Sequence, residues 1–178
     1  MAEKIPSPEI NERLVEVLEN IEELLMHMSP LPRPFPFPHK RLRPCVGTGI
    51  NFTTMPPAIT AGPLVASGFT LTDDDRSAPA PTPSRVVLRG GTVAFHCGYV
   101  LDIKAPKGCQ NLDITYIEGG GTIEAFDITG VHITSLVVPN TVLPRTITIS
   151  AGARRRAIGK VEIRSANEMY LLQLCCHK

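Results

Sequence analysis

Hydrophobic side chains recur at every second position in the second half of the chain, and this pattern constrains the fold more than any other feature. From Arg85 onward, short runs rich in Val, Ile, Thr and Tyr are bounded by Gly, Pro or Asn. Such alternation places the hydrophobic side chains on one face of a β-strand. The runs are RVVLRGGTVAFHCGYVLDIKA, NLDITYIEGG, GTIEAFDITG, VHITSLVVPN, RTITISAG, IGKVEIRS and EMYLLQLCC.

These runs predict an antiparallel sheet domain over residues 85–178. Seven or eight strands at spacings of about ten residues, with no helical pattern between them, indicate a β-sandwich or jelly roll and not a βαβ fold. Hairpin-type turns are expected at residues 105–108, which read Ala-Pro-Lys-Gly, and at residues 118–121, which read Glu-Gly-Gly-Gly. We therefore expect a mainly β fold.

The amino-terminal residues 1–29 carry a helical pattern instead. Ser7 is a suitable N-cap, Pro8 suits the first helical position, and the prolines from Pro30 onward prevent continuation. The expected helix over residues 8–28 has either a coiled-coil seam or an amphipathic face that packs on its own domain. Hydrophobic residues at heptad spacing are Ile10, Leu14, Val17, Ile21, Leu24 and Met28.

A basic, proline-rich arm follows at residues 30–45. Proline occupies every second position from Pro30 to Pro38, which forces extended geometry and removes half of the backbone donors. Such a segment cannot be an interior strand of a sheet. We expect Phe35 and Phe37 to insert into pockets on a neighbouring subunit, since each burial is worth about 1.5–3 kcal/mol. The arm is basic and carries Arg33, whereas the preceding residues 1–30 are acidic and carry seven glutamates.

Residues 46–84 change to Thr, Gly, Ala and Pro with scattered hydrophobic residues. Both short strands and an extended segment that wraps a neighbour fit this composition. Residues 73–84 contain an acidic cluster and several prolines, which is typical of an exposed loop. The predicted division is therefore a helix at 1–29, the arm at 30–45, a loop-rich segment at 46–84 and the sandwich at 85–178.

The sequence contains no local signature of catalysis. It has no phosphate-binding glycine loop, no nucleophile elbow and no paired-cysteine zinc spacing. His96 and Cys97 are adjacent on one predicted strand, so they point to opposite faces and cannot act together; Cys97 is expected to be buried. We expect no enzyme activity, no cofactor and no metal. Residues that lack the spacing of metal ligands are His96, His132, His177, Cys109, Cys175 and Cys176.

Composition indicates a globular protein kept in a reducing compartment. Of 178 residues, 43% are hydrophobic and 20% charged. No hydrophobic run approaches the roughly 20 residues that span a bilayer, and MAEKIPSPE lacks a signal-peptide core. Five cysteines is an odd number, which favours reduced thiols over a disulfide framework. We expect a cytoplasmic location and no membrane partner.

Charge argues against nucleic acid as the partner. The net charge is only +1, and few aromatic residues lie near the arginines. Arg154, Arg155 and Arg156 are expected on a loop between two strands, either as a solvated turn or as a contact with an acidic neighbour.

The helix, the proline arm and the closing pattern TITISAGARRRAIGKVEIRSANEMYLLQL together resemble accessory structural proteins of tailed phages and related viruses. The resemblance implies a virion component, namely a capsid decoration, head-fibre, neck or tail protein. It also implies assembly in the host cytoplasm. No functional residue is carried over from it.

The sequence therefore predicts a non-enzymatic assembly protein that binds neighbouring subunits of a large particle. We expect a homo-oligomer, with a trimer favoured. The alternative is an oligomeric, lectin-like carbohydrate-binding module, although the absence of Trp and the presence of only three Tyr count against it. The expected interface residues are Leu14, Val17, Ile21, Leu24, Arg33, Phe35, Phe37, Arg154, Arg155 and Arg156.

Overall fold

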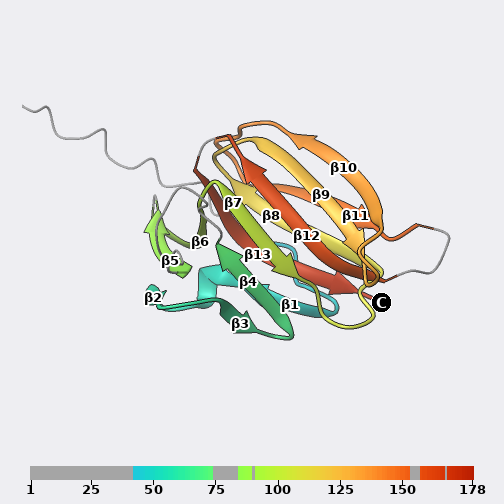
Figure 1. Cartoon of the computed structure of the whole chain (residues 1–178). Helices are drawn as coiled ribbons and strands as arrows, with labels where there is room; N and C mark the ends of the chain where they lie inside the picture. The colour runs from blue at the N-terminus through green and yellow to red at the C-terminus, as the bar shows by residue number, and fades with distance from the viewer. Residues whose placement is uncertain (1–41, 74–83, 90, 153–156, 167) are drawn as a thin grey trace, which may run out of the picture. The chain divides into compact units, whose positions relative to one another are not determined.

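The computed structural model describes residues 42–73, 84–89, 91–152, 157–166 and 168–178. These residues form two antiparallel sheets in a sandwich-like fold, as Figure 1 shows, which confirms the predicted mainly β class. The 3₁₀ turn η1 (Phe52–Thr54) follows the first strand. The strands are β1 (Thr48–Asn51), β2 (Ala58–Thr60), β3 (Leu64–Ala66), β4 (Phe69–Asp73), β5 (Ser84–Arg89), β6 (Thr92–Cys97), β7 (Val100–Lys104), β8 (Asn111–Ile117), β9 (Gly121–Asp127), β10 (His132–Val138), β11 (Arg145–Ser150), β12 (Ile158–Ser165) and β13 (Met169–His177).

The two sheets have different strand orders. The seven-stranded sheet runs β11-β8-β13-β6-β5-β2, with β1 paired to the last part of β13. The six-stranded sheet runs β10-β9-β12-β7-β4-β3. Neighbours in each sheet are often far apart in sequence, as β12 and β7 are, so the fold depends on long-range pairing.

The core lies between the sheets and contains the inward-facing residues of both. Phe52 and Phe95 are fully buried there, with ring centroids 5.5 Å apart. Tyr116 is also fully buried, and its hydroxyl donates a hydrogen bond to the Pro139 carbonyl at 3.1 Å. Burial of a phenolic group requires such a partner.

Residues 48–73 belong to the sandwich and are not a separate segment. Strand β1 pairs with β13, β2 with β5, and β4 with β7. Phe69 and Leu71 point into the core while Thr70 between them points outward. The sandwich therefore begins well before the predicted boundary at Arg85, because a strand of three to five residues carries too few alternations to be recognised in sequence.

The two predicted hairpin turns connect strands of different sheets instead. Residues 105–108 lie between β7 and β8, and residues 118–120 lie between β8 and β9. Glu118 and Gly119 adopt positive φ angles of 54° and 65°. A tight two-residue hairpin occurs at Ser67 and Gly68, where both φ angles are positive, as a type I′ turn between β3 and β4 requires.

Four of the five cysteines form disulfides, so the expectation of reduced thiols was wrong for them. Cys45 is bonded to Cys175, and Cys109 to Cys176, with a Cα separation of 5.5 Å in each pair. Cys175 and Cys176 take different partners because adjacent residues of a strand point to opposite faces. The fifth, Cys97, is free and buried as predicted, and burial raises the pKa of its thiol well above the ordinary value.

The predicted helix at 8–28 and the arm as far as Arg41 lie outside the described residues. Among those that are described, no helix is long and apolar enough to cross a membrane.

Gly121 tests the close approach of two strands. A Cβ atom at this position would clash with the backbone of Arg164 and Ser165 on β12. Gly121→Ala is therefore expected to lower the free energy of unfolding by about 1–3 kcal/mol, measured by urea denaturation. Gly62→Ala is the control, since a Cβ there meets nothing within 4 Å. Equal stability of the two variants would contradict the observed approach.

Candidate ligand-binding face

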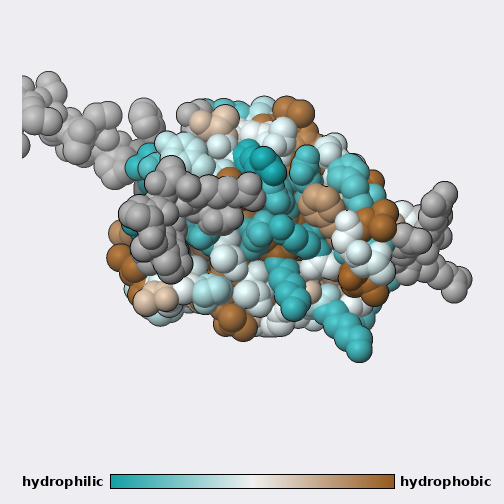
Figure 2. All heavy atoms as spheres, viewed as in Figure 1, coloured by the Kyte–Doolittle hydropathy of each residue, from teal (hydrophilic) through white to brown (hydrophobic). Residues whose placement is uncertain are grey.

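The outer surface of the six-stranded sheet is a polar face. Along its central strands most inward residues are hydrophobic, whereas most of the alternate outward residues are charged, hydroxylated or aromatic. Figure 2 shows hydrophilic side chains gathered over β7 and β12. We call this surface the polar face, with the residues Thr70, Thr72, Asp102, Lys104, Thr122, Glu124, Phe126, Lys160, Glu162 and Arg164.

An ion-pair network crosses the middle of the polar face. Lys160 Nζ lies 2.8 Å from Asp102 Oδ2 and 3.3 Å from Glu162 Oε2. Arg164 Nε donates to Glu162 Oε1 at 2.7 Å. The register places Glu162 opposite Asp102 on one side and opposite Glu124 on the other. Three carboxylates in one row would repel one another, so Lys160 and Arg164 are needed to offset their charge.

The network changes the acidity of its own members. Burial raises the pKa of Glu162, but hydrogen bonds from Lys160 and Arg164 lower it by more, so the pKa lies below the ordinary value. Burial lowers the pKa of Lys160, whereas its hydrogen bonds and charge interactions with Asp102 and Glu162 raise it above the ordinary value. At neutral pH these groups are therefore ionised and held in fixed positions.

Glu162→Gln is expected to destabilise the protein more at neutral pH than in acid. Because the folded-state pKa of Glu162 is lowered, its ionised form stabilises the fold at neutral pH, and this contribution is lost as the pH falls below about 4. Urea unfolding at pH 7 and pH 3 measures the free energy of unfolding of the variant and of the wild type. The gap between these two free energies should be smaller at pH 3. Glu124→Gln is the control. A gap of equal size at both pH values would count against the network.

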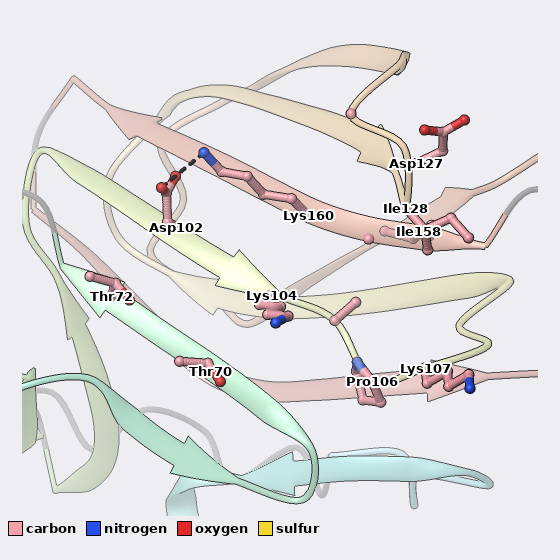
Figure 3. Close-up of a pocket in the computed structure, with 13 residues that line it drawn as sticks. Thr70, Thr72, Asp102, Lys104, Pro106, Lys107, Asp127, Ile128, Ile158 and Lys160 are labelled. Atoms are coloured by element: carbon pink, nitrogen blue, oxygen red, sulfur yellow. Dashed lines mark ion pairs between the residues drawn. The ribbon is translucent and has the colours of Figure 1, made fainter.

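A pocket with a volume of about 610 Å³ opens at the end of the polar face that contains Lys104 and Lys160. In Figure 3 the Lys160 side chain extends from β12 toward Asp102 on β7, and Lys104 and Pro106 lie on the other side of the hollow. Ile128 and Ile158 supply an apolar wall. The pocket thus combines charged groups, the hydroxyls of β4 and a hydrophobic surface.

An aromatic pair lies beside the pocket. Phe126 is half-buried on β9 and is the backbone partner of Lys160. The ring of His132 on β10 meets Phe126 edge-on, with centroids 5.6 Å apart. His132 Nε2 is 2.8 Å from Ser135 Oγ, which orients the imidazole ring. The row across the sheet is therefore Lys104, Lys160, Phe126 and His132.

The predicted interface residues all lie outside the described residues. This applies to the heptad residues, to Arg33, Phe35 and Phe37, and to the arginine cluster at 154–156. The structure therefore does not test these predictions, and they stay predictions.

The candidate metal ligands are distributed over separate contacts. His96 Nε2 is 3.7 Å from Glu168 Oε1, and His177 Nε2 is 2.9 Å from Asp113 Oδ2. Cys109, Cys175 and Cys176 are in disulfides and have no thiolate to offer. Within the described residues, no group of three or more His, Cys, Asp or Glu is placed to hold a metal ion.

The sequence analysis missed the polar face, although part of its signal was present. In GTIEAFDITG the alternation places Glu124 and Phe126 on the same outward face, and in IGKVEIRS it does so for Lys160, Glu162 and Arg164. Phe126, an aromatic residue on the otherwise polar side of its strand, was the available sign of a binding face. The pairing of these two strands could not be read, because β9 and β12 are separated by two other strands in the chain.

No protein-family model matches the chain, and no curated protein sequence matches it at a significant level. One similar solved structure is a family 29 carbohydrate-binding module from Piromyces equi, with 9% identity and a TM-score of 0.42 over 67% of this chain and 87% of that one. A family 6 carbohydrate-binding module has 8% identity and a TM-score of 0.36 over 74% and 94%. A family 43 arabinoxylan arabinofuranohydrolase from Bacillus subtilis has 12% identity and a TM-score of 0.36 over 62% and 24%. At these values the likeness carries no functional argument.

Proposed function

We propose that the protein is a non-catalytic carbohydrate-binding module that holds a saccharide on the polar face. The observation that carries this proposal is the row in which Phe126 lies beside Lys160, with Asp102 and Glu162 in the next row. Sugar recognition requires both an apolar surface and fixed hydrogen-bonding groups, and the polar face provides them side by side.

The charged groups suit hydroxyl recognition because they are already oriented. Lys160 is a donor fixed between two carboxylates, and the carboxylate oxygens are acceptors for sugar hydroxyls. Thr70 and Thr72 on β4 add hydroxyls that can donate or accept. Fixed groups lose little conformational entropy when a ligand binds, which favours affinity.

Phe126 provides the apolar part of the proposed site. One face of a pyranose ring is lined by C–H groups, and these can pack on an aromatic ring. The edge-on contact with His132 restricts the orientation of Phe126. The wall of Ile128 and Ile158 extends the apolar surface toward the pocket.

The lowered pKa of Glu162 does not suit this residue to be the general acid of a glycoside hydrolase. Glycoside hydrolysis by two carboxyl groups requires one with a raised pKa to act as the general acid. The pKa of Glu162 is shifted the other way by its two cationic neighbours. We therefore assign this carboxylate to ligand contacts and to fixing Lys160.

The disulfides bear on where such a module would work. The two disulfides would persist mainly in oxidising surroundings, such as the outside of a cell. Cell-surface polysaccharides are found in the same surroundings. The proposal therefore places the folded protein outside a reducing cytoplasm, either as a free module or on the exterior of a virion.

A glycan array tests the proposal directly. The full chain, with its disulfides formed, is applied to immobilised neutral and acidic polysaccharides from plants, fungi and bacterial surfaces. Saturable binding to a related set of glycans is the expected result. An array on which every glycan stays at the level of a denatured sample of the same chain would overturn the proposed function.

A second candidate function is the predicted role in particle assembly. The observation that favours it is an apolar side chain on the edge strand of the six-stranded sheet. This strand is β10, and its Val137 is 85% exposed. Val142 follows in the next loop and is also exposed. An apolar sheet edge is a template for pairing with another chain. Light scattering on the full chain, beside a chain that begins at Cys45, tests it. A trimer from both chains supports pairing through β10, and a trimer that becomes a monomer supports assembly through the removed residues. Two monomers contradict self-assembly.

A further inference from the structure

A second pocket lies on the opposite side of the sandwich, on the outer surface of the seven-stranded sheet. Its volume is about 420 Å³, which falls within the range of small-ligand sites. The floor is formed by outward residues of β8, β11 and β13, and the rim by residues 42–45 and Pro144. No residue of this pocket belongs to the polar face.

Gln173 is the central feature of the floor. It is only 7% exposed, and its side chain lines the pocket. A glutamine amide carries two N–H donors and one carbonyl acceptor, so a ligand in the pocket can both donate to it and accept from it. The strand register places Gln173 beside Thr115, which is also buried and lines the same pocket.

The groups around Gln173 are polar and oriented. Thr115 Oγ1 and Thr146 Oγ1 lie 2.8 Å apart and share one hydrogen bond, which leaves one hydroxyl hydrogen for a ligand. Thr148 Oγ1 donates to Asp113 Oδ1 at 2.6 Å, while His177 Nε2 lies 2.9 Å from Asp113 Oδ2. The floor therefore presents donors and acceptors in fixed places.

The rim is held by a covalent bond. Cys45 is bonded to Cys175, whose backbone partner on β8 is Asp113. The disulfide fixes the chain beside Leu42 and Pro44 over the floor, and Pro144 lies on the other side. The pocket thus has a polar floor and a mixed rim, in which the cationic Arg43 lies among the apolar side chains of Leu42, Pro44 and Pro144.

We propose that this pocket is a second saccharide-binding site, which takes one or two sugar rings with the Gln173 amide bonded to their hydroxyls. Alternating donors and acceptors on the floor match a ligand whose groups both donate and accept, and the apolar side chains of the rim match the C–H face of a ring. The inference rests on the proposed function. A protein with sites on two opposite faces can join two glycan chains, which raises its avidity on a surface.

Nuclear magnetic resonance can test this on the full chain, because the side-chain N–H₂ of Gln173 gives its own signals. The probes are glucose, galactose, mannose, xylose and N-acetylglucosamine, each titrated to millimolar excess. The expected result is a saturable shift of the Gln173 side-chain signals, together with a separate set of shifts at Phe126. Gln173→Leu removes these signals, so its effect is read at the backbone N–H signals of Thr115 and Thr146 in the same pocket. Their sugar-dependent shifts should disappear in this variant, and the set at Phe126 should remain.

The two sites fail in different ways. Shifts confined to Phe126 and its neighbours would overturn the second site and leave the proposed function standing. Shifts at neither face would contradict both. If Gln173→Leu lowers stability so far that the fold is lost, Thr146→Val on the edge strand β11 takes its place, because it removes one floor hydroxyl at an exposed position. Unchanged Gln173 shifts in that folded variant would overturn the assignment.

Discussion

Phe126→Ala is expected to weaken saccharide binding by about 10- to 100-fold. Burial of a phenylalanine ring against a ligand is worth about 1.5–3 kcal/mol, and this contribution is lost when the ring is removed. The ring is half-buried on the outward face of β9, and the core on the inward side consists of Ile123 and Ala125. The fold should therefore survive the change.

Calorimetric titration with the best glycan from the array measures the affinity of this variant. Phe126→Tyr keeps an aromatic ring and should retain binding within a few-fold. Ile59→Ala is the matched control, because it removes an exposed apolar side chain on β2, in the other sheet. An affinity of Phe126→Ala equal to that of Ile59→Ala would exclude the aromatic row from the site.

Loss of the disulfides should have the largest effect on stability. The double replacement of Cys109 and Cys176 by serine is expected to lower the free energy of unfolding by about 2–5 kcal/mol. The two cysteines are 67 residues apart in the chain, so their bond removes much of the conformational freedom of the unfolded state. The bond between Cys45 and Cys175 closes a loop of 130 residues and should contribute a similar amount.

Urea unfolding with and without a reducing agent measures this effect. The urea concentration at the midpoint of unfolding should be lower for the fully reduced wild type than for the oxidised wild type. A thiol assay confirms the reduction. Cys97→Ala serves as a control, because it removes a buried sulfur without breaking a cross-link and should cost less, about 1 kcal/mol. Identical midpoints of oxidised and fully reduced protein would contradict a stabilising role for the disulfides.

Much of the sheet structure could be predicted, because alternation is a local property of the sequence. The run IGKVEIRS became β12 with Val161 and Ile163 inward, and NLDITYI became β8 with Leu112 and Ile114 inward. Strand pairing could not be predicted in the same way. Which strand lies beside β12 is decided by the packing of the whole core, and β7 and β9 occupy those places.

The cysteines show a second limit of local reasoning. Adjacent cysteines near the carboxyl end looked unlike a disulfide framework. The two partners, Cys45 and Cys109, are brought to β13 only when β1 and the chain before β8 fold against it. An odd count was consistent with one free thiol, Cys97, and two bonds.

The candidate site depends both on local alternation, which can be read from the sequence, and on strand register, which cannot. The outward positions of Glu124, Phe126 and Lys160 follow from alternation within two runs, so the polarity of this face was accessible from sequence. Their meeting in one place was not, because it depends on the register between β9 and β12. The scarcity of Trp and Tyr directed attention away from a sugar site that would use phenylalanine.

Hydrogen–deuterium exchange of the full chain, with and without the best glycan from the array, tests the central claim most directly. The proposed function predicts slower exchange in β7, β9 and β12 and in the loop of residues 128–131 beside the pocket. Phe126→Ala, at the same glycan concentration, should lose that protection. Protection that is absent from the six-stranded sheet while the glycan is bound would contradict the assignment of the polar face.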